Sequence, residues 1–156
     1  MDIQSVADEQ EIRRLGAAYA DACNRLCAED AAACFAPDGT MGRMGEKAVP
    51  GDKMLKMYTN LFNGCEFLFQ SLHSGLVELN GGRAKARWWM NELLRQRHDM
   101  QWRVNYGMYE DELVRLEGGW RFASRRFALR ATLKLNEADM AVHPAFQYAA
   151  LTPKMA

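Results

Sequence analysis

The sequence of 156 residues has no long apolar run, no excess of charge of either sign and no Cys-x-x-Cys pair. A membrane span needs about 18 consecutive apolar residues, and the N-terminal Met1-Asp2-Ile3-Gln4 lacks the basic and apolar character of a signal sequence. Twenty basic residues balance twenty acidic ones, which disfavours nucleic acid and anionic membranes as partners. We therefore expect a cytoplasmic protein with no nucleic-acid or membrane partner.

Metal-ligand spacing is also missing. The four cysteines, Cys23, Cys27, Cys34 and Cys65, include no Cys-x-x-Cys pair, and the three histidines are far apart in the sequence. A structural zinc site needs four Cys or His ligands, in closely spaced pairs. We predict free buried thiols, no metal site and no cofactor.

The first 62 residues have patterns that are typical of helices joined by turns. A helix is predicted to begin at Ser5, whose hydroxyl can cap the following amides, and to continue to Leu26 with apolar residues at helical spacing. Two more helices are predicted over residues 29–35 and 51–62. A short strand over residues 40–44 follows the turn Pro37-Asp38-Gly39.

The rest of the chain predicts a sheet. Four long strands, over residues 67–79, 84–97, 102–116 and 120–135, are separated by short turns and form an antiparallel meander. Strands of this length must bend, and Gly75 and Gly107 are candidate bulge positions.

The predicted fold class is α+β: a cone-shaped, curved antiparallel sheet that wraps around the N-terminal helices and encloses a pocket. Residues 1–135 are expected to form this domain. Residues 136–156 are expected to form a tail that either closes the pocket or packs on a neighbouring subunit.

Two adjacent tryptophans predict a subunit contact. Because side chains alternate along a strand, one of Trp88 and Trp89 faces the interior and the other faces outward. An exposed tryptophan is costly to leave in water. We expect a homodimer or homotrimer that associates through the outer sheet face.

Several short motifs together resemble one known family. They are Ile12-x-x-Leu15-x-x-x-Tyr19-x-x-x-Cys23-Asn24, Phe35-Ala36-Pro37-Asp38-Gly39, Leu72-His73, Gly107-x-Tyr109-x-Asp111-Glu112-Leu113 and Gly119-Trp120-Arg121-Phe122. In this order and spacing they resemble the SnoaL-like branch of the nuclear transport factor 2-like superfamily, from about residue 8 to about residue 130. Relatives of this kind include scytalone dehydratase, bile acid dehydratase and hexachlorocyclohexane dehydrochlorinase, and also the largely structural beta subunits of ring-hydroxylating dioxygenases.

The resemblance implies a catalytic group with one departure from the family pattern. The family's His base corresponds to His73 and its Tyr to Tyr19, whereas Asn24 stands where the relatives have an orienting Asp. The implied function is a cofactor-independent lyase or isomerase of the dehydratase type, in which His73 removes a proton, Tyr19 donates and Asn24 orients the imidazole. Replacing Asn24 by Asp would then raise activity. The alternative is a non-catalytic ligand binder or an assembly subunit resembling a dioxygenase beta chain.

The expected ligand is a small hydrophobic or cyclic molecule. Glu92 shares a strand face with apolar residues, so it is a candidate acid or base if that face lines the pocket, and it is solvated if the register is shifted by one residue. The residues expected to bind the substrate are Met54, Leu55, Tyr58, Trp88, Met90, Glu92, Tyr109 and Phe146.

Overall fold

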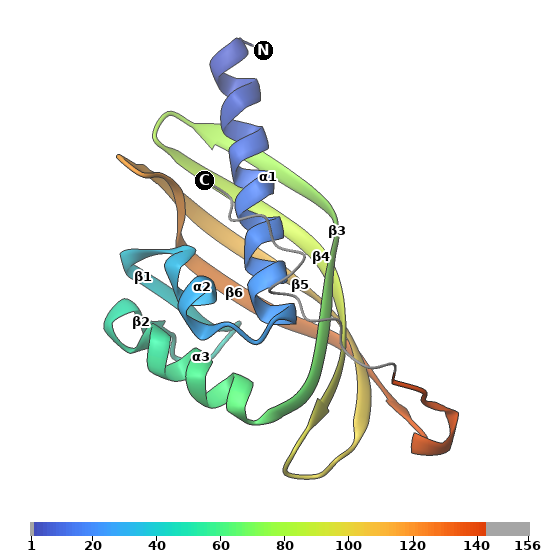
Figure 1. Ribbon diagram of the computed structural model, residues 1–156. Helices are drawn as coiled ribbons and strands as arrows, with labels where there is room; N and C mark the ends of the chain where they lie inside the picture. Colours follow the sequence, from blue (N-terminus) through green and yellow to red (C-terminus); the bar gives the residue numbers. More distant parts are fainter. Residues whose placement is uncertain (1, 143–156) are drawn as a thin grey trace, which may run out of the picture.

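The computed structural model describes residues 2–142 and has the predicted α+β architecture. Three helices, α1 (Ile3–Asn24), α2 (Ala28–Ala33) and α3 (Met54–Asn63), precede the long strands, and the 3-10 turn η1 (Gly51–Lys53) leads into α3. In Figure 1, α1 lies across one face of a strongly curved sheet, with α2 and α3 beside its C-terminal end. The concave face of the sheet is therefore the helix-covered face.

The sheet has six strands in the order β2-β1-β6-β5-β4-β3. The strands β3 to β6 form the predicted antiparallel meander, and β1 pairs with β6 in parallel. A second 3-10 turn, η2 (Glu137–Asp139), follows the last strand. The strand bounds are β1 (Phe35–Arg43), β2 (Val49–Pro50), β3 (Cys65–Asn80), β4 (Arg83–Gln96), β5 (Trp102–Leu116) and β6 (Gly119–Leu135).

Helix α1 begins earlier than predicted. Its N-cap is Asp2, whose carboxylate accepts a hydrogen bond of 2.7 Å from the backbone N–H of Ser5, so Ser5 lies inside the first turn. Aspartate and serine are about equally good N-cap residues, so the sequence alone did not distinguish a helix capped by Asp2 from one capped by Ser5. Ile12, Tyr19 and Cys23 are buried at helical spacing and set the face that packs on the sheet.

The first strand is longer than predicted, and the second helix is shorter. The helix ends at Ala33, and β1 already pairs with β6 at Phe35, opposite Phe122. Phe35 and Phe122 are buried, with ring centroids 5.4 Å apart. This parallel pairing joins segments far apart in the sequence, so local periodicity could not reveal it.

The two predicted bulge positions are confirmed. The register of β3 on β4 shifts between Leu72 and Gly75, and that of β5 on β6 shifts between Tyr106 and Gly107. At Gly75 the indole of Trp88 lies so close that an added Cβ would be 2.1 Å from its Cε3 atom. Glycine at this position therefore permits the close packing of the tryptophan.

Strand β4 alternates as predicted, and the adjacent tryptophans face opposite sides. Trp88 is buried in the core, whereas Trp89 is 45% exposed on the outer face. Trp88 donates through Nε1 to Asp111, which also binds Arg125 in the core.

The described part of the tail, from Asn136 to Val142, is largely exposed. Most of the tail that was expected to close the pocket or to pack on a neighbouring subunit, residues 143–156, lies outside the described residues. No helix within residues 2–142 is long and apolar enough to cross a membrane.

Candidate active site

A cavity of about 310 Å³ lies between the helices and the concave face of the sheet. Its walls come from the C-terminal half of α1, from α3, from β1 and the loop that follows it, and from the inner faces of β3 to β6. Exposed charged side chains, Arg43, Glu46 and Lys47, line its outer end. The deeper walls are mainly apolar, as expected for a site that holds a small molecule.

Three tyrosines form the polar part of the inner wall. Tyr58 donates a hydrogen bond of 2.9 Å to the hydroxyl of Tyr19, and the rings of Tyr19 and Tyr109 meet edge-on at 5.9 Å. Burial raises the pKa of Tyr19, Tyr58 and Tyr109 well above the ordinary range of a phenol. These hydroxyls therefore stay protonated well into the alkaline range and are available as hydrogen-bond donors.

Glu92 places a carboxylate in the same cavity. Its Oε1 accepts a hydrogen bond of 3.0 Å from Asn105, and the amide nitrogen of Gln70 lies 3.4 Å from its Oε2. The same Gln70 nitrogen is 2.9 Å from the hydroxyl oxygen of Tyr109. Within residues 2–142, Glu92 forms no ion pair.

The amide of Gln70 links the carboxylate to the tyrosine. The side chain is only 4% exposed, and its Oε1 has no hydrogen-bond partner among the described residues. Because a carboxylate only accepts hydrogen bonds, the side of the amide that faces Glu92 must be its nitrogen. The sequence did carry a signal for Gln70, because it is the polar member of the inward-facing series Leu68, Gln70 and Leu72.

His73 does not face this cavity, so its expected place in the site is wrong. It is exposed on the outer sheet face, where its Nε2 lies 2.5 Å from the Oδ1 of Asn91. Gln70 and Leu72 point inward, so strict alternation turns His73 outward, and the bulge before Gly75 leaves Ser74 exposed beside it.

Asn24 has a different partner from the one expected. Its Nδ2 donates to the backbone carbonyl of Gln70 at 2.9 Å, and its Oδ1 accepts from the Gln70 N–H at 2.5 Å. Both polar atoms are used to fasten the end of α1 to β3. The predicted dyad of His73 and Asn24 is absent, whereas the predicted donor Tyr19 does line the cavity.

The other predicted contacts divide into three groups. Tyr58, Glu92 and Tyr109 line the cavity. Met54, Trp88 and Met90 are buried in the surrounding core. Leu55 is 47% exposed, so its expected contact is wrong, and Phe146 lies outside the described residues.

Leu55 is in the first turn of α3, before the residues that reach the cavity. Residues of α3 that line the cavity, Met57, Tyr58, Leu61 and Phe62, follow the i, i+1, i+4, i+5 pattern of one helix face. Leu55 is seven residues before Phe62 and so points in a similar direction, but in the first turn it is exposed. Met57 and Leu61 were assigned to the helix from the sequence but not to the site.

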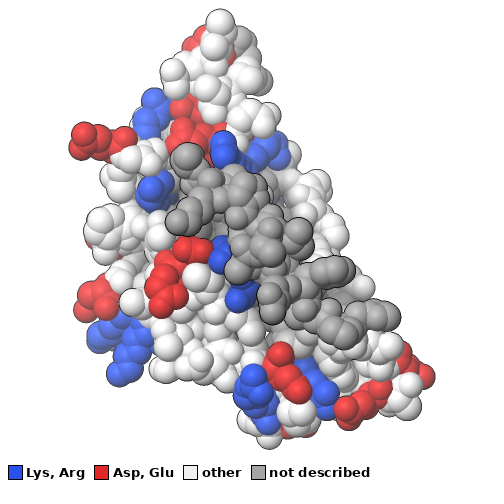
Figure 2. Space-filling view, in the orientation of Figure 1, with Lys and Arg blue, Asp and Glu red and all other residues white. Residues whose placement is uncertain are grey.

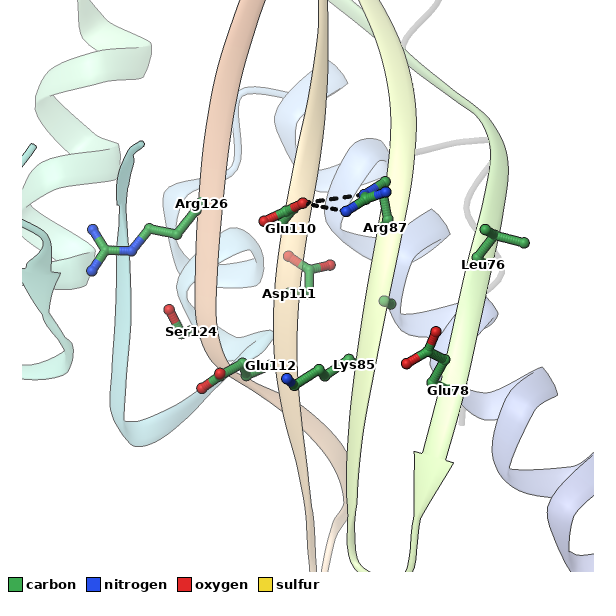
Figure 3. A pocket seen from close by; sticks show the side chains of 10 residues that line it. Leu76, Glu78, Lys85, Arg87, Glu110, Asp111, Glu112, Ser124 and Arg126 are labelled. Carbon is green, nitrogen blue, oxygen red and sulfur yellow. Dashed lines mark hydrogen bonds and ion pairs between the residues drawn. The ribbon is translucent and has the colours of Figure 1, made fainter. Parts of the chain in front are cut away.

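A second, larger groove lies on the opposite face of the sheet. Figure 3 shows its charged side chains in rows across neighbouring strands, including Arg87 of β4, which binds Glu110 of β5 at 2.6 Å. Lys85 and Glu112 are directly paired on the same two strands. One cross-strand ion pair and a neighbouring pair of opposite charges account for this surface without a ligand.

Neither the potential metal ligands nor the charge distribution on the visible face indicates a second binding site among the described residues. Among residues 2–142, no three His, Cys, Asp or Glu side chains are placed to hold a metal ion. All four cysteines are free, with Cys23, Cys34 and Cys65 buried and Cys27 partly exposed. On the helix-covered side shown in Figure 2, basic and acidic side chains are mixed rather than gathered by sign.

Residues 4–126, which include all the described lining residues of the cavity except Phe127, match the SnoaL-like domain family. The chain belongs to this SnoaL-like family. No curated protein sequence matches it significantly. Solved structures share its cone-shaped fold. The structure of hexachlorocyclohexane dehydrochlorinase LinA-type3 from Novosphingobium barchaimii LL02 superposes on this chain with a TM-score of 0.80 at 14% identity, and the match covers 93% of this chain and 100% of that one.

Two proteins of Novosphingobium aromaticivorans have the same fold as this SnoaL-like chain. A proposed scytalone dehydratase is 17% identical, with a TM-score of 0.79 over 87% of this chain and 93% of that one. A proposed aromatic ring hydroxylase is 20% identical, with a TM-score of 0.76 over 83% of this chain and 94% of that one. At these identities the likeness establishes the fold, and the chemistry depends on the side chains of the cavity.

Proposed function

We propose that the cavity binds a small, mainly apolar cyclic molecule and that Glu92 removes a proton from it in a cofactor-independent lyase or isomerase reaction. The observation that carries this proposal is the carboxylate of Glu92 in a largely apolar cavity. It accepts a hydrogen bond from the amide of Asn105, and the Gln70 amide nitrogen lies between it and the hydroxyl of Tyr109. The base is thus Glu92 rather than His73, which faces outward.

The reaction follows from what the two groups can do. Glu92 takes a proton from the carbon next to a ring carbonyl, and the bonding electrons move toward the carbonyl oxygen. Tyr109 stabilises that oxygen by donating a hydrogen bond, because its raised pKa keeps it protonated. The electrons on the oxygen then return to form a carbon–carbon double bond, and a leaving group on the next carbon departs with its bonding pair. The proton on Glu92 passes to the leaving group or to water. Alternatively, the proton returns at another carbon, which is an isomerisation.

The names of two similar structures support elimination as the reaction class. One is a dehydrochlorinase and another a proposed dehydratase, and both names describe loss of a small group with a proton. The absence of the expected His dyad supports the competing proposal, a non-catalytic ligand binder or assembly subunit. Both proposals place the ligand in the same cavity, so the experiment must measure proton transfer itself.

Deuterium exchange tests proton removal without knowledge of the leaving group. The protein is incubated in D₂O with 2-tetralone, an aromatic-fused cyclic ketone, and incorporation at the carbon next to the carbonyl is followed by NMR. Glu92→Gln keeps the size and removes the base, so exchange should fall by about a hundredfold or more. His73→Ala is the matched control and should exchange at the wild-type rate.

Two results would overturn the proposal. One is a Glu92→Gln protein that exchanges as fast as the wild type. The other is a wild-type protein that binds 2-tetralone, as seen by ligand-induced NMR shifts, yet exchanges no faster than buffer. The second result would establish the non-catalytic binder instead.

A further inference from the structure

A row of polar side chains crosses the concave face of the sheet. Glu92 of β4, Asn105 of β5 and Thr132 of β6 are directly opposite one another in the strand register. Directly opposed residues project to the same face, so the three side chains lie in one line. The row runs from the cavity to the exposed end of β6, where Thr132 reaches solvent.

The hydrogen bonds along this row have one consistent direction. The hydroxyl of Thr132 donates to the Oδ1 of Asn105 at 2.8 Å, and the Nδ2 of Asn105 donates to the Oε1 of Glu92 at 3.0 Å. A carboxylate only accepts, so the nitrogen of the Asn105 amide must face Glu92, and its oxygen is left to face Thr132. Both ends therefore hold the amide of Asn105 in a single orientation.

The two oxygens of Glu92 are left in different states. Oε1 has a hydrogen bond of ordinary length from Asn105, whereas the nitrogen of Gln70 is 3.4 Å from Oε2, beyond the usual range. Oε2 therefore has the weaker donor of the two oxygens and keeps more of its electron density for a proton. A donor on Oε1 also stabilises the ionised carboxylate that a base requires.

We infer that Asn105 is a positioning residue for Glu92, that Thr132 acts through Asn105, and that Oε2 of Glu92 is the oxygen that accepts the substrate proton. This inference rests on the proposed function, because it assigns roles around the same base. The side chains of the row, one from each of three strands, hold the carboxylate in one orientation. Orientation matters because a small misplacement of a catalytic group lowers the reaction rate strongly.

A double-mutant cycle on deuterium exchange of 2-tetralone tests the inference. Asn105→Leu, which is similar in size and lacks the donor, should lower kcat by about tenfold to a hundredfold while KM stays within a factor of about two. Thr132→Val should lower kcat by a smaller factor. In the Asn105→Leu background, Thr132→Val should have no further effect, because the path from Thr132 to Glu92 is already broken.

Thr59→Val is the matched control for the loss of a threonine hydroxyl. Thr59 is exposed and, within residues 2–142, donates to the backbone carbonyl of Leu55 in α3, so the kcat and KM of Thr59→Val should equal those of the wild type. Thermal unfolding of each variant establishes whether it is folded. If Asn105→Leu does not fold, Thr132→Val still tests the row, because Thr132 is on the surface and its substitution should not disturb the core.

The outcomes separate this inference from the function on which it rests. A wild-type kcat in Asn105→Leu, together with lost exchange in Glu92→Gln, would overturn the inference and leave Glu92 as the base. An equal effect of Thr132→Val in both backgrounds would overturn the role of Asn105 as the link. Undiminished exchange in Glu92→Gln would overturn the proposed function and the inference together.

Discussion

Asp111 binds Arg125 with both carboxylate oxygens, at 2.8 Å from Nε and 2.7 Å from Nη2, and both side chains are completely buried. The guanidinium carbon is 4.3 Å from the ring centroids of both Tyr19 and Tyr109 and 3.9 Å from that of Phe122. The ion pair therefore lies directly behind the two tyrosines that line the cavity.

Arg125→Met should lower the free energy of unfolding by about 3 to 5 kcal/mol, because it leaves the carboxylate of Asp111 buried without its counter-charge. Urea denaturation at pH 7 measures the loss. Arg87→Met is the control, since the pair of Arg87 with Glu110 is half exposed and should contribute less than about 1 kcal/mol. Equal losses in the two variants would contradict a structural role for the buried pair.

Asn24→Asp should destabilise the protein and should not raise activity. The new carboxylate cannot donate to the backbone carbonyl of Gln70, which loses its side-chain partner, at a cost of about 1 to 3 kcal/mol in unfolding free energy. Because His73 faces outward, the added carboxylate has no imidazole to orient. A rise in exchange rate in Asn24→Asp that disappears in Asn24→Asp/His73→Ala would show that the dyad forms after all.

The outer sheet face should join two or three copies of the chain. Trp89, Tyr106 and Leu133 are between 45% and 54% exposed there, a large apolar area for a monomer surface. Leu133→Lys should reduce the mass measured by light scattering to that of one chain. Val6→Lys, at an exposed position on α1, should leave the mass unchanged. A one-chain mass for the wild type at micromolar concentration would refute this prediction.

Stability should fall as the pH rises above about 9. Burial raises the pKa of Cys23 to about 12 and that of Cys34 to about 11, from the model-peptide value of 9.0. Between pH 9 and pH 11 the unfolded chain loses these protons and the folded chain keeps them, so each thiol favours unfolding by up to about 1.4 kcal/mol per pH unit. Urea denaturation from pH 8 to 11 should show a shallower slope in Cys23→Ala, and an unchanged slope would contradict the assignment.

Much of the architecture could be predicted because it depends on short-range periodicity. Strand β5 has the bounds predicted from alternation and turn residues, and the bulges lie at Gly75 and Gly107. The alternation along β4 also identified the face that carries Glu92, although the choice between a cavity and solvent stayed open until the helices were in place. Local patterns determine which residues share a face.

Tertiary structure decided what each face meets. The site prediction failed at His73 because the direction of a strand residue depends on its exact register, and the bulge that turns Ser74 outward beside it depends on pairing with β4. It failed at Asn24 because the partner, the backbone of Gln70, is 46 residues away. The sequence by itself determined the helices, the meander and the inward series of β4. Only the folded chain, by bringing four strands into register, placed Gln70, Glu92, Asn105 and Thr132 in one row, because cross-strand neighbours are set by long-range pairing that no local pattern encodes.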